Sequence, residues 1–136
     1  MVRKLLLIVV LLFVFIPPTK AQDLTGKWRW NSPNGQVVYS LTLNQISKDR
    51  FSGVHCIQNF KRNIEECFTP DQEITVTLVK ITENLFKGSL LSGIGKDREM
   101  REIQVQYLPL EDRILFNLTM VPKKSFFIPL EAILQR

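Results

Sequence analysis

Residues 26–43 read GKWRWNSPNGQVVYSLTL, and they contain two runs of alternating side chains joined by a turn. In the first run Trp28 and Trp30 alternate with cationic residues, and in residues 39–44 apolar side chains alternate with polar ones. Alternation with a period of two is typical of a β-strand that buries one face. The intervening Ser-Pro-Asn-Gly favours a tight turn, because Pro fixes φ and Asn-Gly accepts positive φ. This stretch therefore predicts two strands joined by a short turn.

The same period-two pattern recurs along the rest of the chain, and no segment after Gln22 shows a sustained helical period. Residues 59–72 form the one long loop of this prediction. Pro129 cannot donate to a ladder, so it predicts a bulge or a sheet edge in the last strand, with a short helix from Leu130 as the alternative. We predict eight strands, at residues 26–31, 36–46, 50–58, 73–82, 85–92, 99–108, 113–120 and 125–134.

Short connections between consecutive strands favour an antiparallel up-and-down meander. Eight strands of this kind can close into a barrel, which removes the exposed sheet edges. A two-layer sandwich fits the same pattern and is the alternative. We predict an all-β fold, a single antiparallel meander of about eight strands that closes into a barrel.

The first residues have the composition of an export signal. Two cations precede an apolar run at residues 5–16, which ends at Pro17 and Pro18, and small residues follow at 19 and 21. A spanning helix needs about 20 apolar residues, so this run is too short for a stable membrane anchor. We predict a signal peptide at residues 1–21 and a β-barrel domain at residues 22–136, located in the periplasm or outside the cell.

The charge of the chain gives no argument for nucleic acid. The full sequence of 136 residues has a formal charge of +5, but residues 22–136 carry 15 Lys and Arg against 13 Asp and Glu, or +2. An apolar content of 45% is that of a folded domain, and the length allows one domain. We expect neither a nucleic-acid partner nor stable membrane insertion.

Cys56 and Cys67 are the two cysteines, with ten residues between them. In an exported protein this pair favours a structural disulfide, while a metal site or a redox pair is the alternative. A metal would need further ligands, and the only histidine, His55, faces the opposite side of its strand from Cys56. We expect a disulfide, no metal and no cofactor.

Part of the N-terminal half resembles known barrel proteins. Residues 24–28, Leu-Thr-Gly-Lys-Trp, resemble the opening of the avidin family and the lipocalin entry motif, and residues 51–53 resemble a Phe-Thr-Gly segment of avidin. The resemblance implies a calycin-like barrel with Trp28 packed as a structural residue at its closed end. Trp30 and His55 stand where avidin has two biotin ligands, so biotin binding is not expected. A cation stacked over the Trp is expected from Arg136 or Arg113.

Four residues are candidates to contact a ligand in the barrel interior. Aromatic side chains would form its walls, and one or two polar groups would orient the ligand. Each residue also has a structural interpretation, as a core aromatic, a tyrosine at the barrel rim or a structural histidine. The candidates are Trp30, Tyr39, His55 and Phe116.

These observations lead to two hypotheses about function. The first is an exported, non-enzymatic, lipocalin-like protein that binds a small apolar or amphipathic ligand. The second is a module with a solid core that contacts another secreted protein through residues 59–66, although the charges of this loop are by default solvated. Gly53, Gly88 and Ser89 would leave space in the barrel, whereas bulky residues such as Ile74 favour a filled one. No catalytic motif is recognisable, so we do not expect an enzyme.

Overall fold

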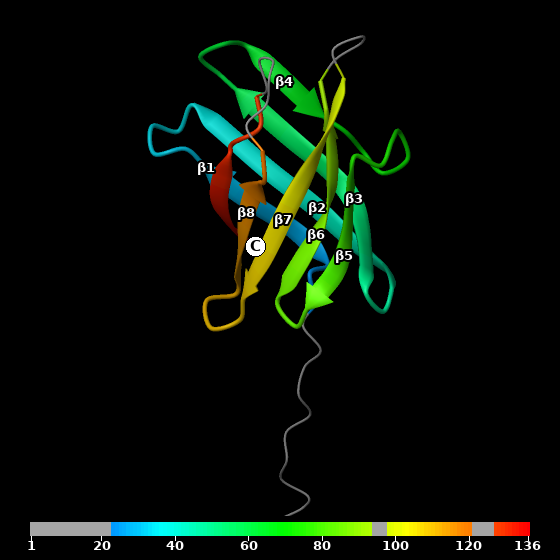
Figure 1. The fold of residues 1–136 in the computed structure, drawn as a ribbon. Coiled ribbons are helices and arrows are strands. Elements are labelled where there is room, and N and C mark those ends of the chain that lie inside the picture. The colour runs from blue at the N-terminus through cyan, green and yellow to red at the C-terminus, as the bar shows by residue number, and fades with distance from the viewer. Residues whose placement is uncertain (1–22, 94–97, 121–126) are drawn as a thin grey trace, which may run out of the picture.

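The computed structural model describes residues 23–93, 98–120 and 127–136, and its described part is entirely β-structure and loops (Figure 1). The predicted signal peptide lies outside these residues. The strands are β1 (Gly26–Asn31), β2 (Val37–Ser47), β3 (Arg50–Asn59), β4 (Ile64–Cys67), β5 (Val76–Thr82), β6 (Leu85–Ser92), β7 (Glu99–Leu108), β8 (Arg113–Leu118) and β9 (Glu131–Gln135).

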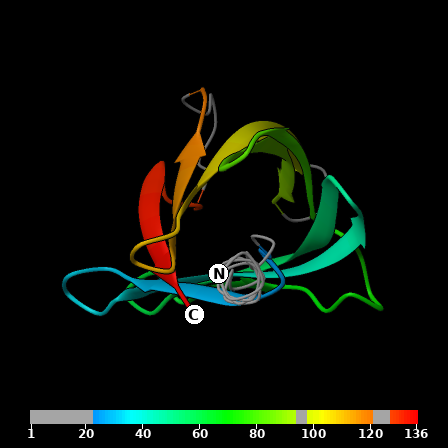
Figure 2. The same cartoon turned by 90° about the horizontal axis from the view of Figure 1, so that it is seen from below.

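Eight of these strands form a closed antiparallel barrel. Each pairs with the next in the order β1, β2, β3, β5, β6, β7, β8 and β9, and β9 pairs with β1 to close the ring. Seen from below, the strands curve around a common centre (Figure 2). The barrel prediction is confirmed, and the sandwich alternative is wrong.

The predicted long loop contains a short strand that the sequence pattern did not indicate. β4 pairs antiparallel with the end of β3, from Asn59 opposite Ile64 to Cys56 opposite Cys67. The expected disulfide joins this last pair. β4 has only four residues, and its two consecutive glutamates hide the period-two alternation.

The last strand also differs from its prediction. β9 begins at Glu131, two residues after Pro129, so the predicted segment 125–134 starts too early, and residues 125 and 126 lie outside the described structure. The helical alternative is wrong. Pro129 lacks the amide that a ladder needs, and the strand forms only beyond it.

Inward side chains of all eight barrel strands make one hydrophobic core. The alternation predicted for β2 is observed, with Tyr39, Leu41 and Leu43 fully buried. Ile74 was expected to point inward, but it precedes β5 and is 43% exposed. The largest side chains that are almost completely buried are Trp28, Tyr39, Phe86, Phe116, Leu24, Leu41, Leu43, Ile57, Leu78, Leu90, Ile103 and Ile114.

Two glycines bring neighbouring strands close together rather than leaving space. A Cβ atom on Gly53 would lie 1.8 Å from the carbonyl oxygen of Thr42 on β2. A Cβ atom on Gly88 would lie 1.7 Å from the carbonyl oxygen of Thr77 on β5. The expectation of local free space at these positions is therefore wrong, because the neighbouring backbone already occupies it. Ser89 is hydrogen-bonded to the exposed Thr77, at 3.0 Å between their hydroxyl oxygens.

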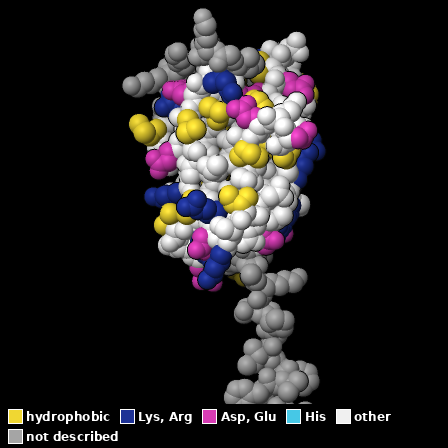
Figure 3. Space-filling model, turned by 90° about the vertical axis from the view of Figure 1, so that its right-hand side faces the viewer, with side chains coloured by type: hydrophobic (Ala, Val, Ile, Leu, Met, Phe, Trp, Pro, Cys, Tyr) yellow, Lys and Arg dark blue, Asp and Glu magenta, His cyan; other side chains and the backbone are white. Residues whose placement is uncertain are grey.

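The outer surface that Figure 3 presents carries no continuous apolar patch among its described residues. Hydrophobic side chains lie there singly or in small groups between charged and neutral surface. Scattered exposure of this kind is normal for protein surfaces and does not indicate a docking face.

Candidate functional site

The barrel closes at a narrow seam between β1 and β9. These strands share a single residue pair, Arg29 opposite Gln135, whereas every other neighbouring pair in the ring shares four or more. Beyond Arg29, in the direction of Asn31, the two strands are not paired. In this part of the seam, no hydrogen-bonded β9 residue lies beside β1, so a β1 side chain can reach the outer surface between the two strands.

Arg136, the residue after β9, connects the chain segments at the end of the seam where β1 begins. Its guanidinium stacks 4.4 Å from the centroid of the Trp28 ring, which confirms the cation expected there and selects Arg136 over Arg113. It donates two hydrogen bonds to Asp112, at 2.8 and 3.1 Å, and two to the carbonyl oxygens of Asp23 and Thr25, at 3.1 and 3.0 Å. Chain segments on both sides of the seam are thereby joined to one side chain.

The two aromatic residues beside Arg136, Trp28 and Tyr107, also form hydrogen bonds. Trp28 is fully buried, and its indole N–H donates to the carbonyl oxygen of Leu24 at 2.8 Å. Tyr107 packs edge-on against Trp28 and donates its hydroxyl proton to Asp112. Hydrogen bonds from Arg136 and then from Tyr107 hold the pKa of Asp112 below its ordinary value.

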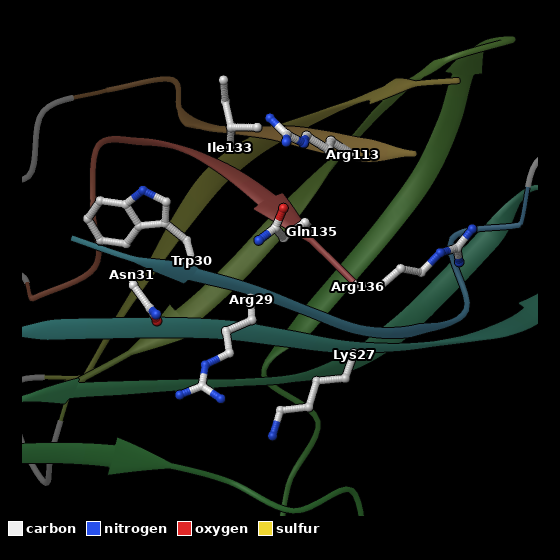
Figure 4. A pocket seen from close by; sticks show the side chains of 8 residues that line it. All are labelled: Lys27, Arg29, Trp30, Asn31, Arg113, Ile133, Gln135 and Arg136. Carbon is white, nitrogen blue, oxygen red and sulfur yellow. The ribbon is translucent and has the colours of Figure 1, made fainter. Parts of the chain in front are cut away.

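A groove runs along the outer face of the seam, with a volume of about 680 Å³. It combines cationic, amide and apolar side chains, which Figure 4 shows on β1, β8, β9 and the residue after β9. None of the side chains of these eight described residues is a carboxylate. The lining residues are Lys27, Arg29, Trp30, Asn31, Arg113, Ile133, Gln135 and Arg136.

Strand alternation explains most of this lining, and the open seam explains Trp30. Polar residues of β1 face outward, because Trp28 faces the core and neighbours alternate. Trp30 shares the inward side with Trp28 and packs against the core, yet it is only partly buried. Its indole reaches the groove because β9 does not pair with β1 at this position.

The other three predicted ligand residues lie together in the barrel interior without accessible surface. Tyr39 and Phe116 are in contact, with ring centroids 5.2 Å apart, and His55 lies on the neighbouring strand β3. A chamber large enough for a water molecule would leave accessible surface on its walls. The structure thus separates Trp30, which reaches the surface, from Tyr39, His55 and Phe116, which do not.

A buried polar cluster surrounds His55. Its Nδ1 atom lies 2.8 Å from the hydroxyl of Thr75, and its Nε2 atom lies 3.4 Å from a carboxylate oxygen of Glu66. Glu66 also accepts hydrogen bonds from the hydroxyl of Ser92, at 2.8 Å, and from the amide of Gly93. Burial alone would raise the pKa of Glu66, but the nearby His55 ring and the hydrogen bonds from Gly93 and Ser92 lower it below the ordinary value.

Sequence reasoning missed Glu66, because it treated residues 59–66 as solvated. The side chain is buried, with only 4% of the residue exposed. The cysteine pair contained a signal for this position: antiparallel strands joined at Cys56 and Cys67 place the residues next to each cysteine on the same face. His55 and Glu66 are two of these four residues, together with Ile57 and Phe68.

Two buried polar atoms of this interior have no hydrogen-bond partner in the described structure. They are the hydroxyl of Tyr39 and Nε2 of His55. Burial, and then the charge of Glu66, raise the pKa of Tyr39 well above its ordinary value. The hydroxyl therefore stays protonated, and a substrate in solvent has no path to it.

A smaller pocket of about 310 Å³ lies beside β4, but the protein's own side chains already use it. Arg98 pairs with Glu73 at 2.7 Å and lies 5.9 Å from the centroid of the Phe68 ring. No group of three or more side chains suited to hold a metal ion occurs among the described residues. The seam groove is therefore the stronger candidate site.

No protein-family model matches this chain, and neither a curated protein nor a solved structure matches it. The barrel is therefore established by the structure, while the resemblance to avidins and lipocalins stays a prediction. Within the described residues, no helix has the length and hydrophobicity to cross a membrane.

Proposed function

We propose that the protein is an exported, non-enzymatic binding protein for a small amphipathic molecule, which it holds in the seam groove. The observation that carries this proposal is the groove itself, where Trp30 and Ile133 lie beside guanidinium and amide groups. Its volume of about 680 Å³ is within the range of small-molecule sites. An apolar surface with a few polar groups is the usual composition of such sites.

The groove replaces the barrel interior as the proposed place of binding. Trp30 keeps its proposed contact with the ligand, since its indole is accessible from the groove. Tyr39 is the residue paired with Trp30 on β2, and Phe116 packs against Tyr39. We assign Tyr39 and Phe116 a supporting role in the barrel wall that positions Trp30, and His55 a structural role in the buried cluster with Thr75 and Glu66.

Export is supported by two independent features. The sequence of residues 1–21 has the order of charge, apolar run and small residues that signal peptidases recognise. The disulfide between Cys56 and Cys67 is of a kind that persists in oxidising compartments. We therefore propose a periplasmic or extracellular location.

Native mass spectrometry of the protein purified from its own host tests the proposal. We expect an adduct that is lost on denaturation and that is absent from a Trp30→Ala variant. A Tyr39→Phe variant is the matched control, because it alters a buried aromatic next to Trp30 and should keep the adduct. An adduct that survives Trp30→Ala and disappears in Tyr39→Phe would place the ligand in the barrel interior instead.

A second candidate function has its own observation. Phe60, at the turn between β3 and β4, is 62% exposed, and Lys61 and Arg62 beside it are exposed as well. The disulfide braces this hairpin, so the turn presents an aromatic and two cations on a rigid base. Such a tip fits contact with another secreted protein. Loss of a co-purified protein partner in a Phe60→Ala variant, with the wild-type protein free of adducts, would favour this function.

A further inference from the structure

The cations of the groove are arranged as a row across three strands. Gln135 on β9 is paired with Arg29 on one side and with Arg113 on the other. Neighbouring strands are about 4.8 Å apart, so the Cα atoms of the two arginines lie about 10 Å apart with the Gln135 amide between them. Figure 4 shows Gln135 in this central position.

The two arginines of this row, Arg29 and Arg113, form no ion pair with another side chain of the described structure. Arg136 is paired with Asp112, but no ion pair between described residues involves Lys27, Arg29 or Arg113. Lys27 lies two residues before Arg29 on the same face of β1, so it adds a third positive charge about 7 Å from Arg29 along that strand. The polar half of the groove is therefore a site for negative charge.

The apolar half of the groove, Trp30 and Ile133, lies beside the row of Arg29, Gln135 and Arg113, displaced along the strands. Ile133 is two residues from Gln135 along β9, which is about 7 Å at the rise of an antiparallel strand. Trp30 directly follows Arg29 and presents its indole in the unpaired part of the seam. A flat apolar body on Trp30 and Ile133 would thus place an attached group about 7 Å away, between the two arginines.

We infer that the ligand of the groove is an amphipathic organic anion, whose carboxylate, sulfonate or phosphate binds between Arg29 and Arg113. Two guanidinium groups and an amide N–H₂ are suited to a multidentate oxyanion, because each presents planar donors to its oxygens. This inference rests on the proposed function and adds the charge of the ligand. Binding of single-stranded nucleic acid would need an extended basic track with several stacking platforms, whereas the described lining of this groove holds one aromatic side chain, Trp30.

A pair of fluorescent dyes tests the sign of the charge. 1-Anilinonaphthalene-8-sulfonate and N-phenyl-1-naphthylamine share the same aromatic body, and only the first carries a sulfonate. We expect the native protein to bind the sulfonate dye about tenfold more tightly at low ionic strength, with this advantage falling as salt screens the charges. The neutral dye reports the apolar half of the groove alone.

Two substitutions connect the result to the groove. Arg113→Gln should weaken binding of the sulfonate dye about fivefold and leave the neutral dye within about twofold of the wild-type affinity. Arg50→Gln is the matched control, since Arg50 is an exposed arginine at the start of β3 and does not line the groove. It should leave both affinities unchanged. Trp30→Ala should weaken both dyes, with circular dichroism confirming that the variant is folded.

The outcomes separate this inference from the proposed function. Equal affinities for the two dyes, both lost in Trp30→Ala, would keep the groove as a binding site and overturn the inference of an anion. Binding that Trp30→Ala leaves intact, or no binding of either dye by the folded protein, would overturn both. Displacement of the sulfonate dye by an equal concentration of single-stranded oligonucleotide would identify a nucleic-acid ligand and also overturn the inference.

Discussion

Folding takes the carboxylate of Glu66 out of water and places it between His55, Ser92 and the amide of Gly93. The pKa of Glu66 is lowered in the folded protein, because the hydrogen bonds outweigh the effect of burial. Its contribution to stability is present above the ordinary pKa of 4.5 and is lost as the pH falls through the folded value. Acid should therefore weaken the attachment of β4 to the barrel.

A Glu66→Gln variant tests this contribution. At neutral pH we expect the free energy of unfolding to fall by about 2 kcal/mol, because charged hydrogen bonds are replaced by neutral ones. The difference from the wild-type protein should shrink as the pH falls below about 4.5, because Glu66 of the unfolded chain then takes up its proton before the folded carboxylate does. Urea unfolding at neutral pH and at about pH 3 measures both values. A difference that stays constant over this range would contradict the assignment.

Removal of the Tyr39 hydroxyl should increase stability, whereas removal of the Glu66 charge should decrease it. The Tyr39 hydroxyl is fully buried and has no hydrogen-bond partner in the described structure, so its desolvation is uncompensated. Tyr39→Phe should raise the free energy of unfolding by about 1 kcal/mol, since it removes this cost and keeps the ring on Phe116. Thermal or urea unfolding is the measurement. A clear loss of stability would mean that a bound molecule or a water satisfies the hydroxyl.

At the level of single elements, the close approach of β2 and β3 depends on Gly53. A methyl group there would lie 1.8 Å from the Thr42 carbonyl oxygen, and rigid backbone on both sides cannot move away. Gly53→Ala should therefore destabilise the fold by about 3 kcal/mol or more, as the lower soluble yield and melting temperature would show.

Gly35 supplies the control for this prediction. It occupies the turn between β1 and β2 with φ of +70°, and nothing lies within 4 Å of a Cβ atom added there. Gly35→Ala should cost only about 1 kcal/mol, the penalty of a positive φ. Equal losses at the two glycines would show that backbone conformation, rather than strand approach, is what Gly53 provides.

The elements themselves were largely predictable, and the exceptions have physical causes. Residues 26–31, 85–92 and 99–108 match their strands because alternation and clear turns define both ends. β4 was missed because four residues with adjacent glutamates carry no periodic signal. The candidate site was predictable only at Trp30, since the row of arginines depends on cross-strand register, which a single sequence does not contain.

At the scale of the whole molecule, Arg136 holds the seam that closes the barrel. Arg136→Leu removes the stacking on Trp28, the pairing with Asp112 and two hydrogen bonds to backbone carbonyls. We expect a loss of about 2–4 kcal/mol in stability and faster hydrogen exchange in β1 and β9 than in β2 and β3.

Arg113→Leu is the matched control for the seam. Arg113 lies on the neighbouring strand β8, and none of the hydrogen bonds between described residues involves its side chain. Its replacement should change stability by no more than about 0.5 kcal/mol. If Arg136→Leu has an equally small effect, the paired backbone of the barrel closes the seam without this side chain.

The central claim is that a small amphipathic molecule binds in the seam groove while the barrel interior stays filled. A nuclear magnetic resonance titration of the isotope-labelled protein with 1-anilinonaphthalene-8-sulfonate tests it most directly. We predict shifts of the Trp30 indole signal and the Ile133 methyl signals, while the methyl signals of Leu41 and Ile103 in the core keep their positions. Shifts of the core methyl signals without a response from Trp30 and Ile133 would contradict the claim and place the ligand inside the barrel.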